Sequence, residues 1–183
     1  IVIEGRLRLP YQHALVLQMI TLGVDMIKKV VALSLSLLAA PGVFAASELD
    51  EVLQSFGLVD SNYEYTNNAL ATEFFRLVTN EYAQSLPSHL NSYIKIDSAT
   101  LTPYTGRFNA IYTIPFTPLQ KEAVKQELSN VETLQHLCID YYLPNQFMVA
   151  NNYNVVYSFH DENYRPIVDV RMNVLTCYDA LIQ

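Results

Sequence analysis

The sequence predicts a two-layer α+β domain with the element order αββαββ, in which two helices cover one face of a four-stranded antiparallel sheet. Apolar residues recur at helical spacing over 69–86 and 118–137, and they alternate at strand spacing over 107–116 and 153–160. Turn-forming residues follow the strand-like runs, so the strands are expected to pair as two hairpins.

The first helix is expected over residues 69–86. Asn67 or Asn68 can cap its start, and Pro87 stops it. The apolar positions that define its buried face are Leu70, Phe74, Leu77, Val78, Tyr82 and Leu86.

The first hairpin joins residues 92–102 to residues 107–116. Both runs are rich in β-branched or aromatic residues, and Pro103-Tyr-Thr-Gly106 provides turn chemistry between them.

The second helix is expected over residues 118–137. Thr117 can cap it, Pro118 suits its first position, and Gln120 completes a capping box. The buried stripe comprises Val124, Leu128, Val131, Leu134 and Leu137.

The second hairpin pairs residues 153–160 with residues 166–176. Tyr153, Val155, Tyr157 and Phe159 share one face of the first run, and the second run alternates valines with polar residues. A loop containing Pro144 leads into this hairpin, and Cys177 is expected to close its last strand.

Charge divides the chain into two parts. Residues 1–45 carry four basic and two acidic side chains, a net charge of +2, whereas residues 46–183 carry seven basic and sixteen acidic side chains, a net charge of −9. The net charge of −7 for the whole chain argues against nucleic acid as a partner, because phosphate binding requires a dense basic surface.

A signal-peptide pattern occupies residues 26–45. Lys28 and Lys29 precede an apolar run that ends at a Pro-Gly pair and small residues up to Ala45. The basic end stays on the cytoplasmic side while the apolar run enters the translocon, and cleavage is expected after Ala45. The mature protein is therefore expected to be periplasmic or secreted.

A retained membrane anchor is the alternative, because residues 30–46 approach the length of a bilayer span. Contact with a membrane would then be made only through this uncleaved segment. We expect Met26 to be the initiator and residues 1–25 not to belong to the native protein. Residues 46–67 are expected to form a loosely packed acidic lead-in, and residues 68–183 a single α+β domain.

The chain contains two cysteines, Cys138 and Cys177. An even number in an oxidising compartment favours one disulfide, and closing a loop of this length contributes roughly 4 kcal/mol in the chain-entropy model. Two free buried thiols or a metal pair are the alternatives. Neither cysteine has the Cys-x-x-Cys or Cys/His spacing of a metal site.

Several short runs stand out along residues 80–177. They are Leu86-Pro87, Ile96-Asp97-Ser98-Ala99, Tyr112-Thr113, Leu137-Cys138, Tyr153-x-Val155-x-Tyr157-x-Phe159-x-Asp161, and the spaced positions Ile167, Val174 and Cys177. Together they resemble a group of small exported bacterial proteins that have no assigned activity. The resemblance covers residues 80–177 and implies a paired cysteine and an envelope location. Lys95 stands near a position where the group has Arg, and Tyr164 stands where it has a turn Gly.

No catalytic motif was found in the sequence. It contains no His-Glu-x-x-His, Gly-x-Ser-x-Gly, phosphate loop or dinucleotide fingerprint, and no calcium loop. We therefore expect no catalytic residues, no metal and no cofactor. The leading hypothesis is a non-enzymatic exported protein that binds a partner such as another envelope protein.

Two candidate sites follow from these alternatives. Tyrosine is favoured in recognition surfaces, so the expected partner surface comprises Tyr141, Tyr142, Phe147 and Tyr164. The alternative is a small-ligand carrier or a hydrolase-like enzyme. Its cleft would lie between sheet and helices and would be lined by His160, Asp169 and Arg171.

Overall fold

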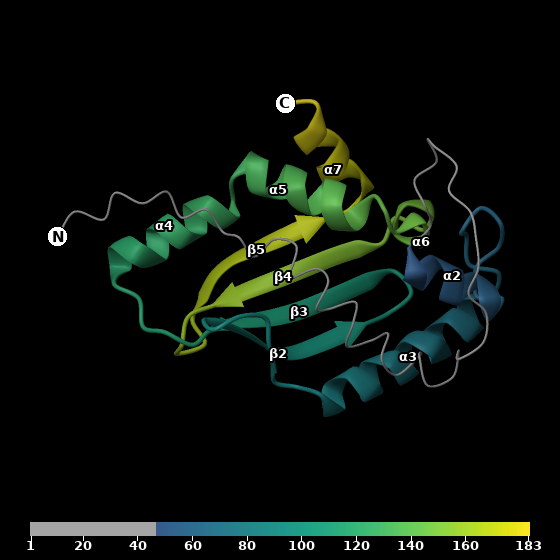
Figure 1. The fold of residues 1–183 in the computed structure, drawn as a ribbon, viewed down its shortest axis with the longest axis horizontal. Helices are drawn as coiled ribbons and strands as arrows, with labels where there is room; N and C mark the ends of the chain where they lie inside the picture. Colours follow the sequence, from purple (N-terminus) through teal and green to yellow (C-terminus); the bar gives the residue numbers. More distant parts are fainter. Residues whose placement is uncertain (1–46) are drawn as a thin grey trace.

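The computed structural model describes residues 47–183, so the predicted upstream segment and signal peptide lie outside the described residues (Figure 1). The elements in chain order are α2 (Glu48–Ser55), α3 (Asn68–Gln84), β1 (Ser88–His89), β2 (Ile94–Leu101), β3 (Thr105–Tyr112), α4 (Pro118–Leu128), α5 (Val131–Leu137), the π-helix η1 (Cys138–Tyr142), α6 (Gln146–Ala150), β4 (Asn154–His160), β5 (Pro166–Met172) and α7 (Val174–Leu181).

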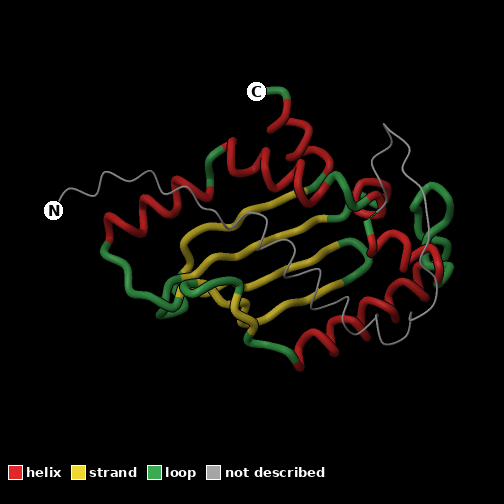
Figure 2. The backbone as a smooth tube through the Cα atoms, in the orientation of Figure 1, coloured by secondary structure: helices red, strands yellow, loops and turns green. Residues whose placement is uncertain are grey.

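The α+β class is confirmed, but the sheet differs from the predicted four antiparallel strands. It has five strands in the order β1-β2-β3-β4-β5, and β3 pairs with β4 in parallel. Figure 2 shows the strands side by side, with helices beyond both edges of the sheet. Both predicted hairpins, β2–β3 and β4–β5, are present. A parallel pair needs a long crossover, and here α4, α5, η1 and α6 supply it.

In the view of Figure 1, helices lie beyond both edges of the sheet. In Figure 1, α3 runs beside β2, and α4 and α5 run beside β5. The predicted helix over 118–137 is divided into α4 and α5, because the Asn130 side chain accepts a hydrogen bond from the Glu132 N–H and caps a new helix there. The predicted capping box of Thr117 and Gln120 is present at the start of α4.

The last predicted strand ends four residues early. β5 stops at Met172, because Asn173 and Thr176 form a capping box that begins α7. Cys177 therefore lies on a helix and not on a strand.

The segment predicted as a loose lead-in is packed into the fold. Leu53 and Asp50 are fully buried in α2. The Asp50 carboxylate accepts hydrogen bonds from the N–H groups of Gln146 (2.8 Å) and Phe147 (2.9 Å). The carboxylate therefore caps α6 from a helix almost a hundred residues away in the chain.

One apolar cluster joins the sheet to the helices. Its buried members include Phe75, Ile96, Phe108, Ala110, Cys138, Tyr142, Phe147, Val155, Tyr157, Val170 and Met172. The predicted buried face of α3 is shifted, since Ala71 and Phe75 are buried while Leu70 and Leu77 are exposed. Among residues 47–183, none of the helices combines the length and hydrophobicity that crossing a membrane requires.

Candidate functional site

Tyr142 and Phe147, two members of the predicted partner surface, are buried and cannot form a surface. The Tyr142 hydroxyl donates hydrogen bonds to the carbonyl oxygens of Met148 (3.1 Å) and Tyr153 (2.8 Å). Burial raises the pKa of Tyr142 to about 12, so this hydroxyl keeps its proton at neutral pH. The Tyr142 hydroxyl thus bonds to α6, and Phe147 is a buried residue of that helix, so the prediction that these two side chains form a partner surface is corrected.

The other two predicted surface residues lie far apart in the fold. Tyr141 is half-buried in η1, and Tyr164 is exposed in the turn between β4 and β5. Figure 1 places this turn at the opposite end of the sheet from α6. Tyr164 lies against β2, where its hydroxyl is 3.4 Å from an Asp97 carboxylate oxygen.

The alternative cleft is present only in part. Asp169 and Arg171 line a depression of about 220 Å³ beside the junction of α4 and α5. Their side chains form an ion pair at 3.1 Å, which leaves both charges already matched. His160 is not among the lining residues, and its Nδ1 lies 3.0 Å from the Ser158 carbonyl oxygen. The three residues do not converge on one point.

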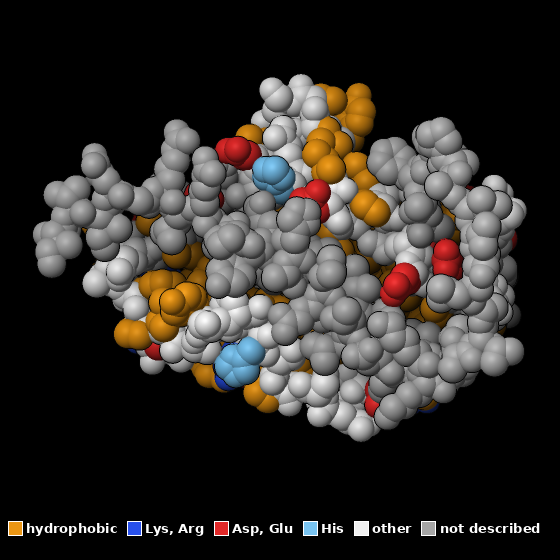
Figure 3. All heavy atoms as spheres, in the orientation of Figure 1, with side chains coloured by type: hydrophobic (Ala, Val, Ile, Leu, Met, Phe, Trp, Pro, Cys, Tyr) orange, Lys and Arg blue, Asp and Glu red, His pale blue; other side chains and the backbone are white. Residues whose placement is uncertain are grey.

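An exposed apolar surface lies on α7, a helix that the strand prediction had not anticipated. We call it the α7 apolar face, and its members are Val174, Leu175, Tyr178, Leu181 and the C-capping residue Ile182. Leu175 and Ile182 are each 66% exposed, and Tyr178 is 62% exposed. Figure 3 shows apolar side chains gathered at the part of the molecule where α7 lies.

The sequence carries a signal that could have revealed this helix. Asn173 and Thr176 have the spacing of a capping box, and the exposed apolar residues follow at i, i+1, i+4, i+7 and i+8. Val168 and Val170 precede the box at strand spacing, and Val174 continues the alternation past Asn173. Residue propensity therefore favours a strand that extends through the start of the helix.

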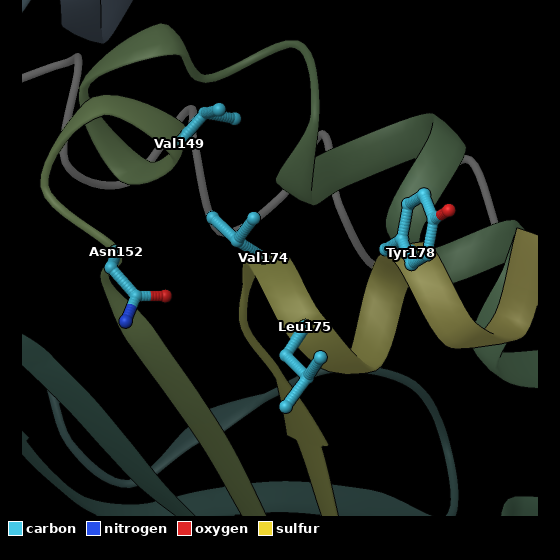
Figure 4. A pocket seen from close by; sticks show the side chains of 5 residues that line it. All are labelled: Val149, Asn152, Val174, Leu175 and Tyr178. Carbon is cyan, nitrogen blue, oxygen red and sulfur yellow. The ribbon is translucent and has the colours of Figure 1, made fainter.

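A groove of about 460 Å³ adjoins this face, and we call it the α7 groove. Its lining residues are Val149, Asn152, Val174, Leu175 and Tyr178. Figure 4 shows Val149 and Asn152 on one side, with the three α7 residues on the other. Asn152 is the single amide among them, and the lining contains no Asp, Glu, Lys, Arg or His side chain.

The predicted disulfide between Cys138 and Cys177 is present and anchors α7. It joins the start of η1 to the inner side of α7, with Cα atoms 5.5 Å apart. The Gln135 side-chain amide adds a hydrogen bond of 2.7 Å to the Ala180 carbonyl oxygen, near the end of α7. These links hold α7 so that its apolar face points outward.

The α7 groove belongs to a helical end of the molecule that comprises α5, η1, α6 and α7, and this end is acidic. Residues 131–153 and 173–183 contain Glu132, Asp140 and Asp179, together with His136, and no lysine or arginine. His136 Nδ1 lies 4.0 Å from the Asp140 carboxylate. An approaching segment with basic residues next to apolar ones would therefore meet complementary charge.

A metal site receives no support from the described part of the chain. Residues 47–183 contain no group of three or more His, Cys, Asp or Glu side chains placed to hold an ion.

Comparisons with known proteins return weak structural similarity. No protein-family model and no curated protein matches the chain. A predicted secreted protein from Pseudomonas aeruginosa aligns with a TM-score of 0.45 and 15% identity over 60% of this chain and 95% of its own.

Two type II secretion pilotins also align. EpsS from Vibrio vulnificus gives a TM-score of 0.39 and 15% identity over 60% of this chain and 90% of its own. AspS from Vibrio cholerae gives a TM-score of 0.37 and 13% identity over 68% of this chain and 99% of its own. At these scores the neighbours carry no inference about the function of this chain.

Proposed function

We propose that this chain is an exported, non-enzymatic binding protein that docks a segment of an envelope protein in the α7 groove. The observation that carries the proposal is the α7 apolar face, where five large apolar side chains are exposed on one anchored helix. Contiguous exposed apolar surface of this kind marks interaction sites in soluble proteins.

The lining of the groove supports a polypeptide segment over a small metabolite. Sites for small ligands combine apolar walls with several convergent polar groups that fix the ligand's orientation. The α7 groove offers Asn152 and the Tyr178 hydroxyl as its polar groups, among three aliphatic side chains. Aromatic and aliphatic side chains in an open groove suit the apolar face of a partner segment.

Charge defines the partner further. The groove belongs to a helical end with three carboxylates and no lysine or arginine, so the docked segment is expected to carry basic residues beside its apolar ones. The same charges disfavour an anionic lipid surface as the partner.

Export is supported by the signal-peptide pattern over residues 26–45 and by the Cys138–Cys177 disulfide. The expected mature protein begins at Ala46. Mass spectrometry of the protein recovered from the envelope or medium tests this, and a chain that retains residues 26–45 would contradict cleavage.

Site-specific photocrosslinking in intact cells tests the docking site. A photoreactive phenylalanine analogue replaces Tyr178 in the groove, or Tyr93, which is 55% exposed and lies just before β2. The expected result is an adduct with an envelope protein from position 178 and none from position 93. Adding Leu175→Asp should abolish the adduct. Equal adducts from both positions, or an adduct indifferent to Leu175→Asp, would reject the α7 groove as the docking site.

A further inference from the structure

Few side chains of α7 are fully buried against the rest of the fold. Within Val174–Leu181, the buried side chains are Cys177, 1% exposed, and Ala180, 2% exposed. Apart from the sulfur bridge, Ala180 is therefore the one fully buried side chain of the helix, while Val174 and Leu181, 39% and 40% exposed, are partly covered. Its large side chains all contribute to the exposed α7 apolar face instead.

The helix cannot be expected to persist by itself. It has eight residues, and isolated helices shorter than about 12–15 residues are marginal in water because nucleation is costly. The capping box of Asn173 and Thr176 stabilises the first turn, and Gln135 satisfies the Ala180 carbonyl near the last turn. The second of these contacts requires α7 to be already in place.

The opposite wall of the groove is anchored independently of the disulfide. Val149 belongs to α6, whose N-terminal N–H groups are bonded to the buried Asp50 carboxylate. Phe147 of the same helix is 1% exposed and packs against Phe75 and Tyr153, with ring centroids 6.3 and 5.5 Å apart. One wall thus rests on the core, and the other rests on the sulfur bridge.

We infer that formation of the Cys138–Cys177 bond assembles the α7 groove, so that the site exists in the oxidised protein and is dismantled in the reduced one. This inference rests on the proposed function and adds its regulation. Two thiols lose two electrons and two protons as the S–S bond forms, and a protein disulfide of the oxidising compartment accepts them and becomes a dithiol. A dithiol reductant reverses the reaction. The docking site would then form only after export.

Hydrogen exchange of the full chain, read by mass spectrometry, tests the inference. The oxidised protein is compared with the same protein reduced by dithiothreitol and with the double variant Cys138→Ala, Cys177→Ala. Amides of α7 are expected to exchange at least about tenfold faster without the bond, while α3 and the strands keep their protection. Glu132→Ala, an exposed change on α5 that keeps the bond, is the matched control and should leave α7 unchanged.

Two results would overturn the inference. One is unchanged protection of α7 after reduction, which would show that the helix holds its place without the bond. The other is an equal loss of protection in α3 and in the sheet, which would show that the bond supports the whole fold and not this site. Direct reduction of the wild-type protein keeps the test decisive if the double variant fails to fold.

The exchange experiment needs no partner, so its outcome is separate from that of the crosslinking. Local release of α7 together with absent crosslinks from position 178 would retain the assembly inference and reject the docking function. Specific crosslinks that persist in the double variant would retain the docking function and reject the assembly inference.

Discussion

The two flanks of the sheet are held in place by different physical means. On the α3 flank, Phe75 is 5% exposed and contacts four other aromatic rings, while Thr79 Oγ1 exchanges hydrogen bonds with the backbone N–H and carbonyl of Leu101. On the opposite flank, α4 and α5 have no fully buried side chain, and α7 is tied down by a disulfide and a glutamine.

This difference shows where apolar side chains are used for folding and where they remain free for another use. The α3 flank gains its stability from burial, so its aromatic residues are unavailable to a partner. On the α7 flank a covalent bond replaces part of that burial, and five apolar side chains stay exposed. The contrast predicts different responses to mutation on the two flanks.

The largest effect is expected on the α3 flank. Phe75→Ala should lower the free energy of unfolding by about 3–5 kcal/mol, because it removes a buried ring and leaves a cavity among the other aromatic side chains. Urea unfolding measures this. Leu77→Ala, on the exposed side of the same helix, is the control and should cost less than about 0.5 kcal/mol. Similar losses from both changes would remove the distinction between the faces of α3.

Asp50 tests the anchored wall of the groove. Asp50→Ala should lower the free energy of unfolding by about 3 kcal/mol, because the buried N–H groups of Gln146 and Phe147 lose their charged acceptor. Glu51→Ala, an exposed change on the same helix, should be close to neutral. If Asp50→Ala is equally mild in urea unfolding, α2 is not what positions α6.

The polar attachment of α4 predicts a pH dependence. Desolvation opposes ionisation of Asp161, but the N–H groups of Arg165 and Asn163 and the Lys121 ammonium at 3.0 Å outweigh it and lower the pKa of Asp161. Because the pKa is lower in the folded state, this stabilisation is present above about pH 4 and is lost as the pH falls through the folded value.

The variant Asp161→Asn lacks this titration. Its free energy of unfolding should therefore fall less between about pH 6 and pH 3 than that of the wild-type protein. Urea unfolding at a series of pH values measures the difference. Parallel curves for the two proteins would mean that Asp161 does not help to hold α4 against the β4–β5 turn.

The smallest effect on stability is expected on the α7 apolar face. Leu175→Asp should change the free energy of unfolding by no more than about 0.5 kcal/mol, since the leucine is 66% exposed. The same change should abolish the crosslink from position 178. A loss comparable to that of Phe75→Ala would identify Leu175 as a core residue and contradict the proposed docking surface.

The sequence by itself determined the features that depend on neighbouring residues. Asn67 caps α3, Thr117 and Gln120 form a capping box, and the turn from Pro103 to Gly106 joins a hairpin, as expected. Each involves hydrogen bonds or dihedral preferences within a few positions, so a short window contains the information. The cysteine pair was also predictable, because the count left a single possible bond within the chain.

Only the tertiary structure decided which apolar residues are covered. Tyr142 and Leu175 both have large, mainly apolar side chains and lie in the same half of the chain. Tyr142 is fully buried, whereas Leu175 is mostly exposed. The difference arises from the parallel pairing of β3 with β4 and from the position in which the disulfide holds α7. Both bring together residues that are distant in sequence. Such contacts depend on the burial available across the whole molecule, which no local pattern records.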